Sequence, residues 1–328
     1  MKKNTSNIET ALVGCGYWGT NIARSLLKIG DKKILVFDNY RQNSITLKKR
    51  FPKKLEIAKN LNSILHNKNV KNVLMATPPN INFLLLKKLI KHQKNIFIEK
   101  PGLKTFNEIN KIKKLKNNKI LMFGYIYTFN NNIKFLKKFV KNKNNGKILY
   151  INFQRQNLGP IRNDVNVSYD LSSHDLSILY YLFNTLPKKI NNNSYPILKK
   201  NISDISNLSF KLKNFFVDIN NSWLNPDKIR RITIISEKKM LLFDEMNLEH
   251  QIKIFNKYAT YPKISDFDNK FFFRKAKIYE GKSFVPNIKQ SDTLKDELKY
   301  FFDCIKRNKK PLTDINFATK ILKCLKDV

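Results

Sequence analysis

The sequence predicts an α/β fold with a doubly wound parallel sheet, followed by an α+β domain with a mostly antiparallel, open sheet. Up to residue 125, strand patterns alternate with helix patterns, which is typical of a parallel sheet covered by helices. After residue 146, strand patterns follow one another with short turns between them, which favours hairpins. We therefore expect two domains, over residues 1–125 and 126–328.

In the first domain, short apolar runs indicate strands and amphipathic runs indicate helices. Thr77-Pro78-Pro79 ends the fourth strand, because proline cannot donate a hydrogen bond within a sheet. We expect strands over residues 8–13, 34–38, 55–58, 70–76, 95–98 and 120–123, and helices over 22–29, 45–51, 61–66, 80–92 and 107–115.

The second domain is expected to mix strands with a few helices. Asn-rich patches at 130–132 and 191–193 are interpreted as turns, and residues 256–290 support no prediction. We expect strands over residues 148–154, 205–212, 215–223, 231–236, 240–243 and 251–255, and helices over 130–141, 172–183, 292–306 and 316–325.

The net charge of +38 is the most unusual property of the composition. Taken alone, it suggests a nucleic-acid or anionic-surface partner. However, the lysines are spread through every expected element and accompany frequent Asn, Ile and Phe, whose codons are rich in A and T. A low-GC genome therefore explains the charge more simply, and we expect no nucleic-acid partner. Attraction of anionic substrates such as nucleotide sugars stays open as an alternative.

The lengths of the apolar runs and the number of cysteines indicate in which compartment the protein is expected. No run approaches about 18 consecutive apolar residues, so we expect neither a membrane-spanning helix nor a membrane partner. The basic N-terminus runs directly into the first strand pattern and is not interpreted as a signal peptide. Cys15, Cys304 and Cys324 are too few and too scattered for a disulfide framework or a metal site. We expect no metal and a cytoplasmic protein.

The stretch Val13-Gly14-Cys15-Gly16-Tyr17-Trp18-Gly19 lies between the first strand and the first helix. In the physical account of this fingerprint, Gly14 permits a tight turn, Gly16 lets the backbone approach a pyrophosphate, and Gly19 lets the helix pack closely on the strand. The phosphates would lie at the helix N-terminus, where N–H groups favour an anion. A structural glycine turn is the alternative, but the surrounding strand–helix–strand pattern favours a Rossmann dinucleotide site.

The fingerprint also requires an acidic residue at the end of the second strand. Asp38 supplies it and is placed to accept from the adenine-ribose 2′-hydroxyl. A carboxylate there would repel a 2′-phosphate, so we expect NAD rather than NADP. Arg41, three residues later, could partly offset the repulsion of a 2′-phosphate, which makes the preference for NAD weaker.

Two features could perform acid–base chemistry. Lys100, in Glu99-Lys100-Pro101, follows a buried strand at the expected cofactor edge, although a solvated lysine is the plainer reading in so lysine-rich a chain. His174 opens a helix, with Asp170 just outside that helix and near enough to orient it. Ser172 and Asp175 fit a capping box, so capping is at least as good an explanation of Asp175 as chemistry.

In this order, the motifs resemble the glucose-fructose oxidoreductase, inositol dehydrogenase and MocA family over nearly the whole chain. The residues that carry the resemblance are the fingerprint, Asp38, Thr77-Pro78-Pro79, Glu99-Lys100-Pro101, and Asp170 with His174. The resemblance implies a Rossmann domain followed by an open sheet that often forms the oligomer interface. It also implies that Lys100, Asp170 and His174 are catalytic, without deciding which of Lys100 and His174 is the base.

The resemblance implies a cofactor site as well. Combined with the motifs above, it gives Gly14, Gly16, Tyr17, Trp18, Gly19, Asp38, Arg41, Thr77, Pro78, Asn80, Glu99 and Lys100 as cofactor-binding residues. The stretch 157–162 before Asp170 looks like that of members from surface-polysaccharide gene clusters. The loop leads toward His174, so candidate substrate contacts are Arg155, Asn157, Arg162 and Asn163, each of which could instead be an ordinary surface residue.

The sequence therefore predicts an NAD-dependent dehydrogenase acting at a secondary alcohol or ketone of a sugar, nucleotide sugar or cyclitol. Inositol dehydrogenase itself is one alternative, and a non-catalytic dinucleotide-binding sensor or subunit is another. Retention of Lys100, Asp170 and His174 speaks against the sensor. We expect a homo-oligomer, a dimer or a tetramer.

Overall fold

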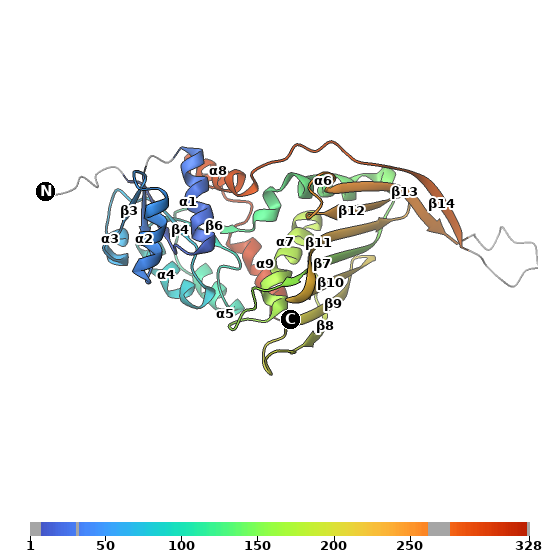
Figure 1. Cartoon of the computed structure of the whole chain (residues 1–328), viewed down its shortest axis with the longest axis horizontal. Helices are drawn as coiled ribbons and strands as arrows, with labels where there is room; N and C mark the ends of the chain where they lie inside the picture. Colours follow the sequence, from blue (N-terminus) through green and yellow to red (C-terminus); the bar gives the residue numbers. More distant parts are fainter. Residues whose placement is uncertain (1–7, 31–32, 262–275, 327–328) are drawn as a thin grey trace, which may run out of the picture. The chain divides into compact units, whose positions relative to one another are not determined.

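The computed structural model describes residues 8–30, 33–261 and 276–326. The chain divides into two compact units (Figure 1). The first comprises Met1–Phe129 and Ser291–Lys326, and the second consists mainly of Asn130–Gln290. Each unit is described by itself below.

The first unit contains a six-stranded sheet in the order β3-β2-β1-β4-β5-β6, and all of its pairings are parallel. The doubly wound fold is therefore confirmed. The order reverses at β1, so β1 and β4 are the neighbours at whose carboxyl ends a ligand site is expected. The strands are β1 (Thr10–Val13), β2 (Ile34–Phe37), β3 (Leu55–Ile57), β4 (Asn72–Met75), β5 (Asn95–Glu99) and β6 (Leu121–Gly124).

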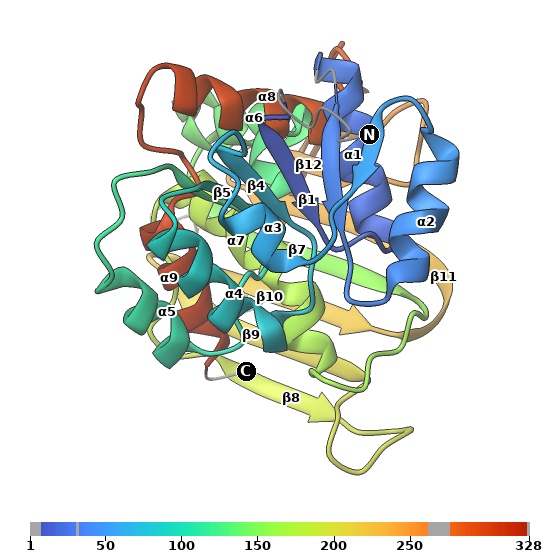
Figure 2. The ribbon, with the colours of Figure 1, turned by 90° about the vertical axis from the view of Figure 1, so that its left-hand side faces the viewer.

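Helices cover both faces of this sheet, because its central strands are apolar on both sides. Figure 2 shows α1 and α2 on one side of β1 and β4, and α4 and α5 on the other. The helices between strands are α1 (Tyr17–Ile29), α2 (Arg41–Arg50), α3 (Leu61–Leu65), α4 (Pro79–Lys91) and α5 (Phe106–Lys113), and the 3₁₀ helix η1 (Ile126–Phe129) follows β6.

The last two helices, α8 (Thr293–Lys306) and α9 (Ile315–Leu325), belong to the first unit. The predicted boundary, which assigned everything after residue 125 to the second domain, is wrong for them. Leu298 and Phe301 of α8 are fully buried in the core that α1 and the central strands form. Apolar packing therefore returns the end of the chain to the domain in which the chain begins.

The second unit contains an eight-stranded sheet in the order β14-β13-β12-β11-β7-β10-β9-β8. Among the described strands of this second sheet, only the β7–β10 pair is parallel, so the prediction of a mostly antiparallel sheet is confirmed. The strands are β7 (Ile148–Leu158), β8 (Asn191–Tyr195), β9 (Ile205–Leu212), β10 (Phe215–Ser222), β11 (Leu224–Ser236), β12 (Met240–Asp244), β13 (Ile252–Thr260) and β14 (Lys277–Phe284).

Two helices, α6 (Asn131–Lys141) and α7 (Ser173–Phe183), lie along one side of this sheet (Figure 1). Side chains of β9 alternate between buried and more exposed, and Phe183 of α7 contacts Phe215 of β10 with ring centroids 4.8 Å apart. A short 3₁₀ helix, η2 (Lys143–Asn145), joins α6 to β7. No helix among the described residues is long and apolar enough to cross a membrane.

Two local predictions in the second unit differ from the structure, and one strand lies where none was predicted. The Asn-rich patch 191–193 is part of β8, where backbone pairing with β9 replaces the predicted turn. β14 lies in the region without a prediction. A π-helical turn, η3 (Ser168–Ser172), precedes α7, so Asp170 lies within a helical turn rather than outside it.

Candidate active site

The glycine loop has the geometry that a dinucleotide requires. A Cβ on Gly19 would be 2.0 Å from the Gly14 carbonyl oxygen, and one on Gly14 would be 2.4 Å from the Ala76 carbonyl oxygen. Gly14 also has a φ of +95°, which disfavours other residues. At Gly16, by contrast, a Cβ would meet no described atom within 4 Å. Space over Gly16 at the start of α1 therefore fits a pyrophosphate.

Asp38 ties the glycine loop to the end of β2. Its Oδ2 accepts from the Cys15 backbone N–H at 2.7 Å, and its Oδ1 accepts from the Tyr40 N–H at 2.9 Å. The carboxylate thus shapes the loop, and its remaining lone pairs could accept from a ribose hydroxyl. Arg41 is exposed at the start of α2. Burial raises the pKa of the Cys15 thiol to about 11, so that thiol stays neutral.

A second loop follows β4. Thr77 donates its hydroxyl to the buried Asn82 side chain, which in turn donates to the Gly102 carbonyl at 2.7 Å. Asn82 thereby links the loop after β4 to the turn after β5. Sequence reasoning missed Asn82, because one polar residue in an amphipathic helix pattern carries no distinctive signal. It gave Asn80, which is exposed at the start of α4.

Glu99 and Lys100 lie where β5 ends, with a cis peptide bond between Lys100 and Pro101. Burial raises the pKa of the Glu99 carboxyl to about 7, and Trp18 and the charge of Lys100 act in the lowering direction. The Glu99 side chain packs on Gly124, where a Cβ would be 3.1 Å from Oε2. Glu99 therefore points into the unit, whereas Tyr17 of the same predicted set is exposed.

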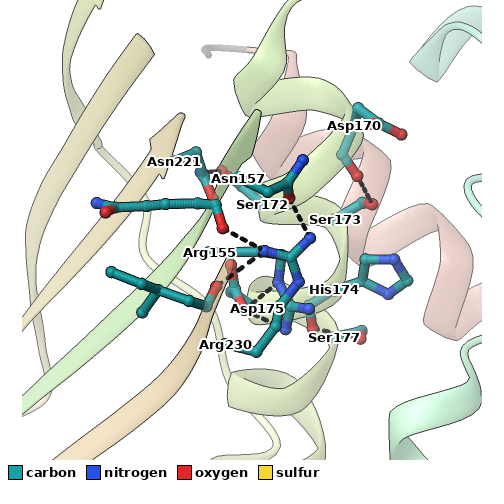
Figure 3. A network of polar contacts seen from close by, with 12 residues as sticks. Arg155, Asn157, Asp170, Ser172, Ser173, His174, Asp175, Ser177, Asn221 and Arg230 are labelled. Atoms are coloured by element: carbon teal, nitrogen blue, oxygen red, sulfur yellow. Dashed lines mark hydrogen bonds and ion pairs between the residues drawn. The ribbon is translucent and has the colours of Figure 1, made fainter. Parts of the chain in front are cut away.

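In the second unit, Arg155 and Asp175 form a buried ion pair (Figure 3). Arg155 of β7 donates from Nε at 3.1 Å and from Nη2 at 2.9 Å to Asp175 Oδ1 of α7. The predicted capping box is wrong, because Ser172 makes no capping bond to a described residue and Asp175 faces the sheet. Arg155 is 5% exposed and held by this pair, so it fixes α7 on the sheet rather than reaching for substrate.

His174 points away from that ion pair (Figure 3). It occupies the first turn of α7, one turn after Asp170. The Asp170 carbonyl accepts from the Ser173 hydroxyl at 2.8 Å, and the His174 carbonyl accepts from the Ser177 hydroxyl at 2.6 Å. Side chains four residues apart lie on one helix face. The buried Arg155–Asp175 pair therefore orients α7, which carries His174 and directly follows the turn that carries Asp170.

The loop after β7 holds the other predicted substrate contacts. Arg162 is bidentate on Asp164, at 2.9 and 2.7 Å, and its Nη1 lies 3.6 Å from Asp170 Oδ1. These carboxylates raise the pKa of Arg162, so it stays charged. Asn163 accepts from Lys199 at 2.6 Å, and Asn157 accepts from Arg230. Arg230, which the sequence reading did not single out, thus anchors the start of this loop.

Comparison with known proteins shows which family the first part of the chain resembles. Residues 8–126 match the GFO_IDH_MocA model, described as an oxidoreductase family with an NAD-binding Rossmann fold. Over these residues the chain is similar to the GFO_IDH_MocA family. The family resemblance seen in the motifs is therefore confirmed, and the glycine loop, Asp38 and the turn at Lys100 all lie within the matched residues.

Two relatives each match a little under half of this chain. An uncharacterized oxidoreductase of Streptococcus pneumoniae is 27% identical over 151 residues, which are 45% of this chain and 40% of the relative. A 2,7-anhydro-N-acetylneuraminate hydratase of Mediterraneibacter gnavus is 24% identical over 148 residues, 44% of this chain and 38% of the relative. The matched part thus spans about two fifths of these relatives.

A solved structure extends the likeness of fold. UDP-N-acetylglucosamine 3-dehydrogenase GnnA of Acidithiobacillus ferrooxidans gives a TM-score of 0.79 at 17% identity, covering 97% of this chain and 95% of GnnA. At that identity the likeness concerns the fold alone. It does include the eight-stranded sheet that the family model does not reach.

Proposed function

We propose that the chain is an NAD-dependent oxidoreductase acting at a secondary alcohol or ketone of a sugar, nucleotide sugar or cyclitol. The observation that carries the proposal is the glycine loop, with open space over Gly16 and the Asp38 carboxylate at the end of β2. The family match to an NAD-binding oxidoreductase fold supports it. A negative charge at Asp38 favours NAD over NADP.

The acid–base chemistry is assigned to Lys100, Asp170 and His174. His174 would take the proton of the substrate hydroxyl, and Asp170, one turn earlier, would orient or assist it. Lys100 would hydrogen-bond the reacting oxygen and stabilise its developing charge. NAD, when bound, supplies the acceptor for the hydride. The role of the base that removes the hydroxyl proton is assigned to Lys100 and His174 together, without choosing between them.

The substrate class follows from charge and from the relatives. UDP-N-acetylglucosamine and 2,7-anhydro-N-acetylneuraminate, in the names of two similar proteins, are both anionic sugar derivatives. Arg162 stays charged at the loop before Asp170 and is suited to a phosphate or carboxylate. A nucleotide sugar is therefore the first choice, and such a substrate would suit a role in surface-polysaccharide synthesis.

We further propose a cytoplasmic homo-oligomer that associates through the eight-stranded sheet. Two alternatives are kept: inositol dehydrogenase itself, and a dinucleotide-binding sensor or subunit without turnover. The substrate panel separates the first alternative from a nucleotide-sugar enzyme. Cofactor binding without any turnover would favour the second.

The test is absorbance at the reduced-nicotinamide band while the protein and NAD meet cyclitols, free sugars and UDP-sugars. Product masses should be followed as well, because one relative is named a hydratase, and adding or removing water would not change this absorbance. We expect one substrate class to react, and we expect His174→Ala and Lys100→Ala each to lower kcat by at least about 100-fold.

Asn118→Ala is the control, since it removes an exposed polar side chain that belongs to neither the proposed cofactor site nor the proposed substrate site. Full activity of the His174 and Lys100 variants would contradict the assigned roles. Turnover without either nicotinamide cofactor would contradict the proposed reaction.

A further inference from the structure

A pocket at the amino-terminal edge of the first sheet, the edge opposite the proposed cofactor site, is lined by basic side chains. Its volume is about 440 Å³, and it lies among the ends of α3 and α4 and the residues before β4, β5 and β6. Glu9, 3.1 Å from Lys71, is the one carboxylate of the described residues that forms an ion pair with this lining. The basic lining residues are His66, Lys68, Lys71, His92, Lys94 and Lys119.

Lys94 is a buried cation without a counter-ion among the described residues. Its side chain is 5% exposed, and its ammonium donates to the Asn67 carbonyl at 2.8 Å and to the Val70 carbonyl at 2.5 Å. Burial lowers the pKa of Lys94. Two carbonyls occupy two of the three ammonium donors and neutralise no charge. Because an unpaired buried charge is unfavourable, an anion in the pocket would stabilise this ammonium.

The ends of the neighbouring helices do not balance the positive charge of the pocket. α3 and α4 both end there, and the C-terminus of a helix carries at most about half a negative charge. These two ends and Glu9 together offset about two of the four lysine charges. An excess of about two positive charges remains while both histidines are neutral, which suits a phosphate group.

The two histidines would add charge when an anion binds. Their rings are in edge-on contact, with centroids 4.7 Å apart. His66 Nδ1 lies 3.0 Å from the Asn62 carbonyl, which can only accept, so Nε2 of the neutral His66 ring carries no hydrogen. Partial burial first, and then the charges of His66, Lys94 and Lys91, lower the pKa of His92. An anion would offset this repulsion, so anion binding should be accompanied by proton uptake.

We propose that this pocket binds the phosphate groups of a small molecule through Lys94, His66 and His92. The inference goes beyond the proposed function, because the pocket lies at the other edge of the sheet and needs neither NAD nor turnover. Inorganic pyrophosphate and the diphosphate of a nucleotide present the same chemistry to these side chains. The probes below distinguish the two sources.

The first test is a calorimetric titration with inorganic pyrophosphate and with UDP at about 0.05 M salt, where screening is weak. Lys94→Met should weaken pyrophosphate binding about tenfold or more, because it removes the buried charged donor. Lys68→Gln removes an exposed charge of the pocket and should weaken binding about threefold. Lys49→Gln, the matched control on α2, should change it less than about 1.5-fold.

The comparison of UDP with pyrophosphate identifies the source of the phosphate groups. UDP binding is attributed to this pocket where Lys94→Met weakens it. Equal affinities for the two probes would assign the pocket to the diphosphate group alone, and tighter binding of UDP would assign it to a nucleotide. Both results support the proposal.

The second test follows the imidazole signals by NMR, since the chain has only four histidines. Sulfate, which stays doubly charged between about pH 6 and pH 8, should shift the signals of His66 and His92, raise the pKa of His92 and leave His250 unchanged. It should bind about fivefold or more tightly at about pH 6 than at about pH 8. His92→Gln cannot take up the proton and should lose most of this difference, whether or not Lys94→Met folds.

Three results would overturn the proposal: no saturation by any of these anions below about 10 mM at about pH 6, unchanged signals of His66 and His92, or equal weakening by Lys94→Met and Lys49→Gln. Binding of an oligonucleotide without binding of pyrophosphate would also overturn it, in favour of an extended basic surface. NADH titration is a separate measurement, so failure of this pocket leaves the proposed function standing, and failure of NADH binding leaves the pocket standing.

Discussion

At the scale of single residues, Gly16 and Gly19 lie in one loop, yet an added Cβ meets opposite surroundings at the two positions. At Gly19 it would lie 2.0 Å from the Gly14 carbonyl oxygen, and at Gly16 it would meet no described atom within 4 Å. Packing of α1 on β1 therefore depends on Gly19. At position 16, where φ is −71°, neither the backbone conformation nor the packing of described atoms requires glycine, and the space is open to a ligand.

This contrast gives a paired prediction. Gly19→Ala should lower the free energy of unfolding by about 2–3 kcal/mol, because backbone must move to admit the methyl group. Gly16→Ala should change the free energy of unfolding by less than about 0.5 kcal/mol. It should weaken NADH binding by about tenfold or more, because the methyl group would occupy the space proposed for the pyrophosphate. Denaturant unfolding and fluorescence titration measure the two effects. Tight NADH binding by Gly16→Ala would contradict the assigned place of the pyrophosphate.

Arg155 gives a second prediction at this scale. Arg155→Met should cost about 3–5 kcal/mol of unfolding free energy, because it leaves the Asp175 carboxylate buried without its partner. Arg231→Met is the matched control: its ion pair with Asp244 is 41% and 19% exposed, and its loss should cost less than about 1 kcal/mol. If Arg155→Met unfolds like wild type and only raises KM, Arg155 is a substrate contact after all.

Residue roles could be predicted from the sequence where a local motif sets them. The glycine loop and Asp38 have fixed spacings along one strand–helix–strand unit, so their placement followed from the sequence. The partner of Asp175 could not be predicted, because Arg155 is 20 residues away on another element.

At the scale of elements, α8 connects the end of the chain to the first sheet. Phe301 is fully buried and contacts Phe97 of β5, with ring centroids 5.9 Å apart. The neighbouring Phe302 is only partly buried. Lys28 of α1 also forms a 3.0 Å ion pair with Asp292, which caps α8. The helix is therefore integral to the core beneath the proposed cofactor site.

Phe301→Ala should accordingly lower the free energy of unfolding by about 3–5 kcal/mol. Phe302→Ala, one position away on the same helix, should cost less than half as much because its ring is partly exposed. Thermal unfolding of both variants measures the two costs. In an NADH titration, the variant that loses more stability should also lose more affinity for NADH. Equal costs for the two substitutions would show that α8 does not face the core as described.

Element prediction succeeded where side-chain periodicity was strong. The parallel strands are continuous apolar runs, and their positions were predicted to within a few residues. β8 was missed because residues 191–193 are all Asn and show no apolar alternation, so only backbone pairing with β9 makes them a strand. The π-helical turn at η3 has no sequence signature that distinguishes it from the start of α7.

At the scale of the whole molecule, the amphipathic patterns of α8 and α9 showed that these helices pack, but not against which sheet. Assignment to the nearer sheet in sequence was the natural prediction and was wrong. The fold class itself followed from the change between alternating and consecutive strand patterns. Contacts distant in sequence therefore set the boundary of the units, while local patterns set their class.

The net charge of +38 gives a prediction at this scale. If the substrate is a nucleotide sugar, raising the salt concentration from about 0.05 to about 0.5 M should lower kcat/KM at least about threefold, because screening weakens its attraction to the protein. A neutral cyclitol or free sugar that is turned over should show almost no change. Equal salt sensitivity for charged and neutral substrates would make the charge irrelevant to substrate capture.

The most direct test of the account is a fluorescence titration of the wild-type protein with NADH and with NADPH. The geometry at Gly16 and Asp38 predicts that NADH binds, and binds at least about tenfold more tightly than NADPH. Asp38→Asn, which keeps an oxygen to accept from the Cys15 N–H but removes the charge, should narrow that gap. Binding of neither cofactor by the folded protein would contradict the dinucleotide site, and with it the oxidoreductase built on that site.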